Sequence, residues 1–168
     1  MDVIVRESCD EDLERLVHLY NQYILETPIT FDLSPYTVEQ RRQSWFVHYK
    51  KTGRYRLFVA EHDQQIVGYA SSSQFATKAA YDTSVETSIY VALDYTGSGI
   101  GSQLYTALFQ VLAVEDVHCV YAGITLPNDA SVAIHQKFGF RQAGLFREVG
   151  RKFDKYWDVA WYEKRRPF

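Results

Sequence analysis

The stretch "YVALDYTGSGIGSQLYTALF", residues 90–109, passes from a strand-like run into a helix-like run through three glycines. Leu104, Leu108 and Leu112 recur at the spacing of one helix face, and residues 117–124, "VHCVYAGI", are apolar enough for a buried strand. The order strand, glycine turn, helix and strand predicts a βαβ unit. We expect this unit to form the centre of a mixed α/β sheet.

The three glycines also suit an anion site. Gly97, Gly99 and Gly101 place bare backbone N–H groups at the start of a helix, where a pyrophosphate can approach without meeting a Cβ atom. The spacing is neither the G-x-G-x-x-G of a dinucleotide-binding fold nor the Gly-Lys-Ser/Thr of a nucleotide-triphosphate loop. A flexible turn between a strand and a helix explains the glycines equally well, so the neighbouring sequence is needed to distinguish an anion site from a simple turn.

Short strands and helices flank the central unit on both sides. The hydrophobic patterns predict strands at residues 3–7, 55–73 (a hairpin turning at 62–65), 84–93, 141–149 and 155–163. Helices are expected after two capping boxes, Ser8 with Glu11 and Thr37 with Gln40, and from Pro127 and Asn128 to Gly139. In the last helix the predicted buried stripe is Ala130, Ile134 and Phe138. An antiparallel opening, a central crossover and an antiparallel end therefore make the sheet mixed.

The segment "ETPITFDLSPY", residues 26–36, connects the first two expected helices. Pro28 and Pro35 argue for an irregular path, while Ile29 and Phe31 are apolar and need cover. Binding residues are often carried by loops of this kind. We therefore expect this connection to line a pocket.

Composition excludes several classes of protein. The chain has 168 residues, 46% of them hydrophobic, which suits one domain over residues 1–168. Its net charge of −3 is spread evenly, which argues against a nucleic-acid partner. No apolar run reaches the roughly 20 residues of a membrane span, and the N-terminus lacks a signal-peptide pattern, so a cytoplasmic protein without a membrane partner is expected. Cys9 and Cys119 have no C-x-x-C spacing and are interpreted as structural thiols, and no metal site is predicted.

Four segments together resemble the GCN5-related N-acetyltransferase (GNAT) family, and within it the phosphinothricin and methionine sulfone acetyltransferases. They are "AYDTSVETSIYV" (80–91), "GIGSQLYTAL" (99–108), "LPNDASVAIHQKFGF" (126–140) and "VGRKFDKYWDV" (149–159). The likeness covers nearly the whole chain and keeps the order and spacing of the family's segments. It implies an α/β fold: one GNAT-like domain with a mixed, mostly antiparallel sheet and a central βαβ unit that binds acetyl-CoA.

The resemblance implies two catalytic residues, Glu86 and His135. Acetyl transfer to an amine needs a base, because a free amine is mostly protonated at neutral pH, and a proton donor for the leaving thiolate. Strand alternation puts Glu86 in the middle of an otherwise apolar strand, where burial can raise its pKa. His135 takes the position of the proton donor. Taken alone, Glu86 could equally be a salt-bridge partner and His135 a buried, hydrogen-bonded helix residue.

The resemblance also implies how acetyl-CoA is held. The backbone of Ile89, Tyr90 and Val91 would bind the pantetheine arm and the thioester oxygen, and Asn128 would contact the cofactor near a helix start. The pyrophosphate would lie against Gly97, Ser98, Gly99, Ile100, Gly101 and Ser102. The family pattern has glutamine or arginine where this chain has Thr96, which implies a weaker hold on the cofactor.

The implied acceptor pocket contains Phe31, Lys78, Ser84, Val85 and Glu86. Methionine sulfone enzymes place an arginine for the substrate carboxylate at the position of Ala76, and phosphinothricin enzymes place two basic residues in this loop, of which only Lys78 matches. Lys78 could hold the carboxylate alone or be an ordinary solvated residue. The acceptor could also be another small amine.

Three functions remain open from the sequence. The first is acetyl-CoA-dependent N-acetylation of a small amino-acid-like acceptor by direct transfer in a ternary complex, in a homodimer as is common among these relatives. The second is a catalytically weak acyl-CoA-binding or sensing protein, which the departures at Thr96 and Ala76 favour. The third is a dinucleotide-binding oxidoreductase, which lacks the glycine spacing and a ribose-binding acid.

Overall fold

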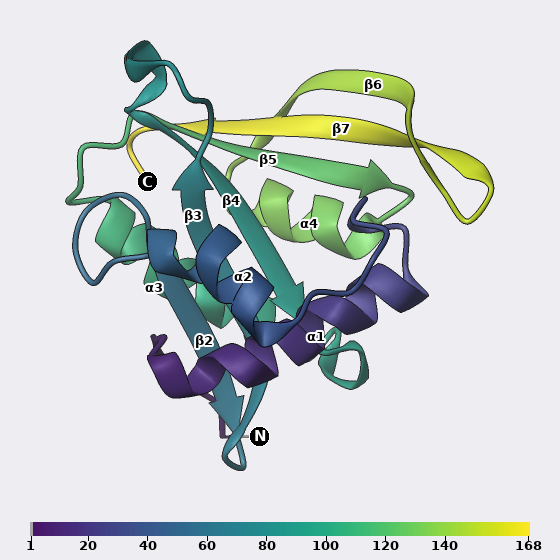
Figure 1. Cartoon of the computed structure of the whole chain (residues 1–168). Helices are drawn as coiled ribbons and strands as arrows, with labels where there is room; N and C mark the ends of the chain where they lie inside the picture. Colours follow the sequence, from purple (N-terminus) through teal and green to yellow (C-terminus); the bar gives the residue numbers. More distant parts are fainter. Residues whose placement is uncertain (1) are drawn as a thin grey trace.

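A seven-stranded sheet forms the centre of the molecule, which we describe from a computed structural model covering residues 2–168 (Figure 1). The strands are β1 (Ile4–Glu7), β2 (Leu57–His62), β3 (Gln65–Gln74), β4 (Ser84–Val91), β5 (Cys119–Leu126), β6 (Arg141–Lys152) and β7 (Lys155–Arg165). Their order in the sheet is β1-β2-β3-β4-β5-β7-β6, and the β4–β5 pair alone is parallel. The predicted mixed, mostly antiparallel sheet is thus confirmed.

Four helices cover the two faces of this sheet. They are α1 (Leu13–Glu26), α2 (Val38–Ser44), α3 (Ile100–Leu112) and α4 (Asp129–Lys137). The pair α1 and α2 covers one face, and α3 with α4 covers the other, while β6 and β7 extend to one side as a long hairpin (Figure 1). The order β4, α3, β5 confirms the predicted βαβ unit.

Side-chain alternation along the strands produces two cores. Tyr69 and Val59 point toward α1, whereas Ala70 and Val85 point toward α3. On β4 the same alternation puts Glu86 on the α1–α2 face, opposite to Val85. The molecule therefore presents Glu86 between the sheet and the α1–α2 layer.

Two local expectations were wrong. The first capping box uses Cys9 and Asp12, not Ser8 and Glu11, because Arg6 binds both carboxylate oxygens of Asp12 and holds that side chain against the Cys9 N–H. In α4, Ala130 is exposed and the buried residue is His135. The helix after Thr37 begins with the predicted box and ends at Ser44, and Trp45 precedes a separate 3-10 turn. Within residues 2–168, no helix is long and apolar enough to cross a membrane.

Candidate active site

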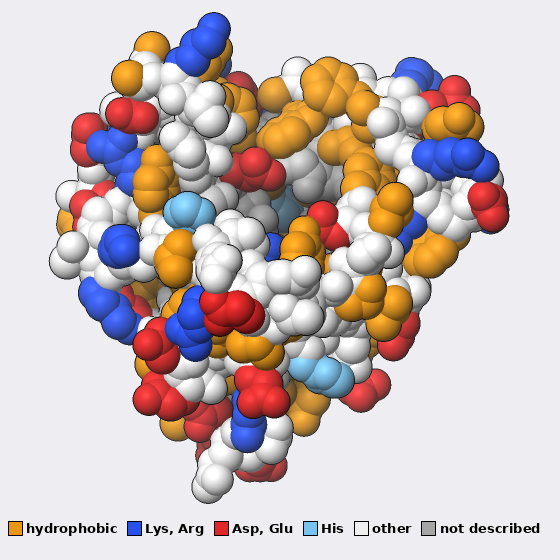
Figure 2. Space-filling model, in the orientation of Figure 1, with side chains coloured by type: hydrophobic (Ala, Val, Ile, Leu, Met, Phe, Trp, Pro, Cys, Tyr) orange, Lys and Arg blue, Asp and Glu red, His pale blue; other side chains and the backbone are white. Residues whose placement is uncertain are grey.

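The strands β4 and β5 separate where the site forms. They pair only over Ser84–Glu86 and Cys119–Tyr121, although each strand continues for five more residues. Beyond the pairing, the β5-facing backbone groups of β4 have no neighbouring strand and are open to another partner. A cavity of about 50 Å³ lies in the gap, lined by residues 87–90, residues 122–125 and the start of α4. Figure 2 shows the surface hollowed here, beneath hydrophobic side chains of the β6–β7 hairpin.

The glycine turn before α3 has the features of an anion cradle. Gly97 and Gly99 have φ angles of 77° and 85°, in the left-handed region that favours glycine. No atom lies within 4 Å of a Cβ built at either residue, so the turn faces open space. Among residues 2–168, the N–H groups of Ile100 and Gly101 have no backbone acceptor, as is usual in the first turn of a helix. Open space and free N–H groups fit a pyrophosphate.

Gly101 links this turn to the cavity through close packing. A Cβ at Gly101 would lie 2.8 Å from Cδ1 of Ile134 and 3.3 Å from Cδ1 of Ile89. Only a glycine lets α3 approach both α4 and β4 without displacing those side chains. The third glycine thus serves packing, while the first two serve the shape of the turn.

Lys137 brings a positive charge to the same turn. Its Nζ donates a hydrogen bond of 2.8 Å to Oγ of Ser102, across from α4 to α3. Sequence reasoning missed Lys137, because 35 residues separate it from Ser102 and only the helix packing joins them. Asn128 caps α4, its Oδ1 accepting from the N–H of Ser131 at 3.1 Å, and it also lines the cavity. The amide nitrogen of Asn128 stays available to a ligand.

His135 lies in the cavity wall and is 2% exposed. Its Nδ1 is 2.7 Å from the carbonyl oxygen of Ser131, which can only accept, so Nδ1 carries the proton. Its Nε2 then accepts from the hydroxyl of Tyr105 at 2.8 Å. Burial lowers the pKa of His135 below its ordinary 6.5, which keeps the ring neutral at neutral pH. Both nitrogens are therefore occupied by the protein.

Tyr105 extends this arrangement toward β4. Its hydroxyl is 3.4 Å from Oγ1 of Thr87, and Thr87 lines the cavity. Tyr105 itself is fully buried, and burial raises the pKa of its hydroxyl. A row of polar groups thus leads from His135 through Tyr105 to Thr87. No sequence pattern pointed to Tyr105, which is one of several residues on the apolar face of α3.

Glu86 follows the last β4 residues that pair with β5. The side chain is half-buried, and none of the ion pairs or side-chain hydrogen bonds found among residues 2–168 involves its carboxylate. Burial raises the pKa of Glu86 above its ordinary 4.5. The nearby Tyr49 hydroxyl is affected by the charge of Glu86, and burial raises its pKa to about 12. A carboxylate with a raised pKa and no cationic partner suits proton abstraction.

The predicted acceptor residues occupy different surroundings. Phe31 packs against Gly150 of β6, where a Cβ would overlap the ring, while Ile29 in the same connection lines the cavity. Lys78 is exposed in the loop between β3 and β4. Val85 is fully buried in the α3 core, so only its backbone can face an acceptor. Ser84, Val85 and Glu86 all lie in β4, the strand that borders the cavity, and of these the side chains of Ser84 and Glu86 are half-buried.

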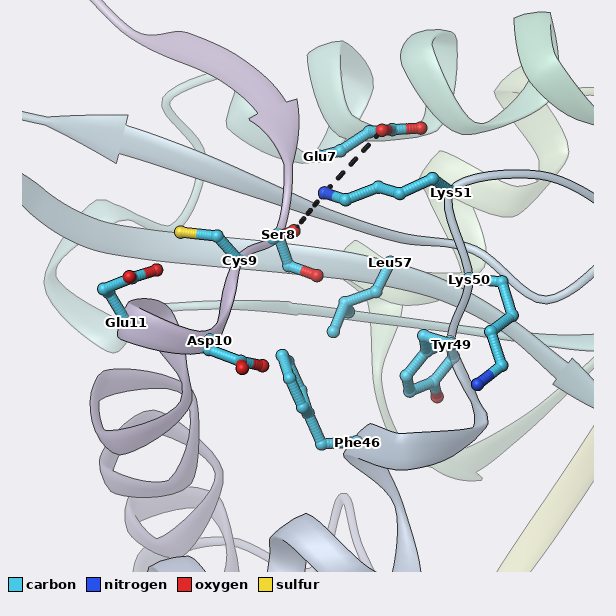
Figure 3. A pocket seen from close by; sticks show the side chains of 10 residues that line it. All are labelled: Glu7, Ser8, Cys9, Asp10, Glu11, Phe46, Tyr49, Lys50, Lys51 and Leu57. Carbon is cyan, nitrogen blue, oxygen red and sulfur yellow. Dashed lines mark hydrogen bonds and ion pairs between the residues drawn. The ribbon is translucent and has the colours of Figure 1, made fainter.

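A larger depression of about 470 Å³ lies elsewhere, between the end of β1 and residues 46–51 (Figure 3). Two of its charged groups engage each other, because Lys51 pairs with Glu7 and also donates to the carbonyl oxygen of Ser8. None of the site residues expected from the sequence lines this depression, whereas Ile89, Tyr90, Asn128 and His135 line the cavity between β4 and β5. We therefore assign the reaction to that cavity, despite its smaller volume.

Comparisons with known proteins relate the chain to one family in sequence and in structure. The model of the Acetyltransferase (GNAT) domain matches residues 5–161. A phosphinothricin N-acetyltransferase of Streptomyces coelicolor is 55% identical over 97% of this chain and 96% of its own length. An L-methionine sulfoximine/L-methionine sulfone acetyltransferase of Pseudomonas paraeruginosa is 28% identical over 97% and 94%. The crystal structure of a phosphinothricin acetyltransferase from Sinorhizobium meliloti in complex with AcCoA superposes with a TM-score of 0.91 at 25% identity, covering 98% of this chain and 89% of that one.

Proposed function

The chain belongs to the acetyltransferase (GNAT) family, and we propose that it transfers an acetyl group from acetyl-CoA to the amine of a small amino-acid-like acceptor. The acceptor class is that of phosphinothricin, methionine sulfone or methionine sulfoximine, and the transfer is direct, within a ternary complex. Residues 1–168 act as one catalytic domain. The observation that carries the proposal is the unpaired, half-buried Glu86 at the point where β4 and β5 separate.

The donor would be held by backbone groups more than by side chains. The open β4 edge at Ile89, Tyr90 and Val91 would bind the pantetheine arm, and the turn from Gly97 to Ser102 would bind the pyrophosphate. Lys137 adds a positive charge beside that turn and offsets the loss of a long polar side chain at Thr96. When bound, acetyl-CoA supplies an activated acetyl thioester.

Glu86 would accept the proton of the acceptor amine. Burial raises its pKa, which makes the carboxylate a stronger base than an exposed glutamate, and among residues 2–168 no cationic partner occupies it. The freed amine lone pair can then attack. The direct reaction needs no covalent acetyl-enzyme, and Cys119, which is buried on β5, takes no part.

His135 would act on the leaving thiolate through its neighbours. Because Nε2 accepts from Tyr105, the neutral ring has no proton to donate from that nitrogen. The Thr87 hydroxyl, which borders the cavity, would donate a hydrogen bond to the thiolate, which then takes its proton from water. His135 would hold Tyr105, and through it Thr87, in place, and is thus a positioning residue.

The test is thiol release from acetyl-CoA with a panel of phosphinothricin, methionine sulfone, methionine sulfoximine, ordinary amino acids and polyamines. We expect release with the first three and intersecting double-reciprocal lines for a ternary complex. Parallel lines would contradict direct transfer. Tight acetyl-CoA binding without release for any acceptor would instead support the second candidate, an acyl-CoA sensor, which the residues Thr96 and Ala76 favour.

Homodimer formation and a cytoplasmic location complete the proposal. The hairpin of the edge strand β6 with β7 exposes five large apolar or aromatic side chains: Leu145, Phe146, Val149, Phe153 and Tyr156. An exposed apolar edge of this kind favours association with a second copy. Light scattering of the protein with Phe146→Asp, against wild type, would detect conversion of a dimer to a monomer. The cytoplasm is proposed because it supplies acetyl-CoA.

A further inference from the structure

Arg41 of α2 is held between aromatic rings beside the acceptor side of the sheet. Its guanidinium carbon lies 4.2 Å from the ring centre of Tyr20, 4.3 Å from that of Trp45 and 5.2 Å from that of Tyr36. Each contact is a cation–π attraction, and together they fix the planar head in one orientation. The aromatic clamp therefore orients a cation that the proposed reaction has not yet used.

The Arg41 guanidinium lacks an anionic partner. Within the described residues 2–168, none of the ion pairs includes Arg41, and its buried Nε makes no hydrogen bond. The adjacent Arg42, by contrast, pairs with Asp10 at 3.6 Å. A buried donor without an acceptor is costly, and a guanidinium offers five N–H donors in a fork that matches a carboxylate. A ligand anion would supply the missing acceptor.

Arg41 and Glu86 both lie on the α1–α2 side of the sheet and close to Tyr49. Tyr90 shares the β4 face of Glu86 and packs at 5.3 Å against Tyr20, one ring of the clamp. Trp45, another ring of the clamp, packs at 5.1 Å against Tyr49. The positive charge of Arg41 lowers the pKa of the Tyr49 hydroxyl and the negative charge of Glu86 raises it, so one hydroxyl lies within range of both.

The acceptor chemistry explains why a cation is needed there. An amino acid carries its carboxylate two bonds from the reacting amine, so a site that positions the amine at Glu86 must also accommodate that anion. The loop between β3 and β4 offers Ala76 and the exposed Lys78 for this purpose. Arg41 is both better oriented and less hydrated than Lys78.

We propose that the Arg41 guanidinium binds the α-carboxylate of the amino-acid acceptor while Glu86 receives the proton of its amine. The inference rests on the proposed acetyltransferase function and narrows its substrate class to amines that bear a carboxylate. The clamp of Tyr20, Tyr36 and Trp45 preorganises the guanidinium fork, so little conformational entropy is lost on binding.

The test compares two acceptors in three variants. Methionine sulfone and its decarboxylated amine, 3-(methylsulfonyl)propan-1-amine, are assayed with Arg41→Gln, Arg41→Lys and the control Arg42→Gln. For Arg41→Gln we expect KM for methionine sulfone to rise roughly 10- to 100-fold, the range of a charge-assisted hydrogen bond, with KM for acetyl-CoA unchanged. Arg41→Lys recovers part of that loss, and Arg42→Gln behaves as wild type. The decarboxylated amine is poor for wild type and is no worse for Arg41→Gln.

Other outcomes separate this inference from the proposed function. Equal losses for both acceptors, with a lowered melting temperature, would make Arg41 a structural residue only and overturn the inference, while the acetyltransferase function stands. Phosphinothricin is assayed as a third acceptor, and a loss confined to it would mean that Arg41 binds the phosphinate, which also overturns the carboxylate assignment.

A binding measurement covers the case in which no acceptor turns over. Trp45 touches the guanidinium, so tryptophan fluorescence should change when methionine sulfone is titrated into wild type and stay constant with Arg41→Gln. An identical response in both proteins would overturn the inference independently of catalysis.

Discussion

Replacing Glu86 by glutamine keeps the shape of the side chain and removes the proposed base. A positioned general base contributes about 10²- to 10⁴-fold to rate, which corresponds to about 3–5 kcal/mol of activation free energy. Because no ion pair or side-chain hydrogen bond among residues 2–168 depends on the carboxylate, this loss should appear in kcat with little change in KM for acetyl-CoA. Thiol release followed by a disulfide reagent measures both constants.

The proposed role of Glu86 also predicts in which direction kcat/KM changes with pH. The carboxylate form is the active base, and burial raises its pKa above 4.5, so kcat/KM should rise with pH through a value above 4.5 in wild type. Glu86→Gln should lose that limb of the profile. The control Asp63→Asn, in the exposed turn between β2 and β3, should keep it.

The stability of the Glu86→Gln variant provides a further test of the assignment. In the folded protein Glu86 keeps its proton at pH values where the unfolded chain has lost it, so the free energy of unfolding falls as pH rises through that window. Glu86→Gln removes this penalty and should melt no lower than wild type at neutral pH. A variant that melts no lower and retains turnover within a factor of about 3 would refute the assignment of Glu86 as base, and a clearly lowered melting temperature would contradict the predicted relief of the penalty.

Three further predictions concern the donor side of the site. Burial lowers the pKa of His135, so as pH falls below about 6.5 the unfolded chain takes up this proton before the folded protein does. The free energy of unfolding, measured in urea, should therefore fall with pH in wild type and not in His135→Gln. The same dependence on pH in both proteins would contradict this. Gly101→Ala forces Ile134 aside and should lower the free energy of unfolding by about 1–3 kcal/mol. It should also weaken acetyl-CoA binding, measured by calorimetry. The control Gly144→Ala, which has open space around its Cα, should change neither quantity. Lys137→Gln should weaken acetyl-CoA binding several-fold at low salt and less at high salt, and a loss independent of salt would exclude an electrostatic role.

Local patterns predicted the scaffold because they depend on neighbours in the chain. The alternation around Glu86 and the three-glycine turn gave the strand, the helix start and the parallel crossover that the structure contains. The capping box at Thr37 and Gln40 formed as predicted for the same reason. The prediction of the first capping box failed because it depends on a residue of another element. Arg6 on β1 binds Asp12, so that Asp12 and not Glu11 caps the first helix.

The candidate site was predictable only in part. The two catalytic candidates came from a family resemblance, and their roles stay predictions. Their surroundings depend on tertiary contacts that no spacing reveals, such as Tyr105 of α3 meeting His135 of α4, or Lys137 meeting Ser102. No sequence pattern singled out Arg41, since its aromatic clamp is assembled from three separate places in the chain.

Transfer of the acetyl group itself is the most direct test. The protein is incubated with acetyl-CoA labelled in its acetyl group and with methionine sulfone or phosphinothricin, and the products are identified by mass spectrometry. The account predicts that the label appears on the α-amine of the acceptor, in amounts equal to the thiol released, and that Glu86→Gln abolishes most of it. Label found only in free acetate, or no acceptor labelled at all while acetyl-CoA binds, would contradict the account.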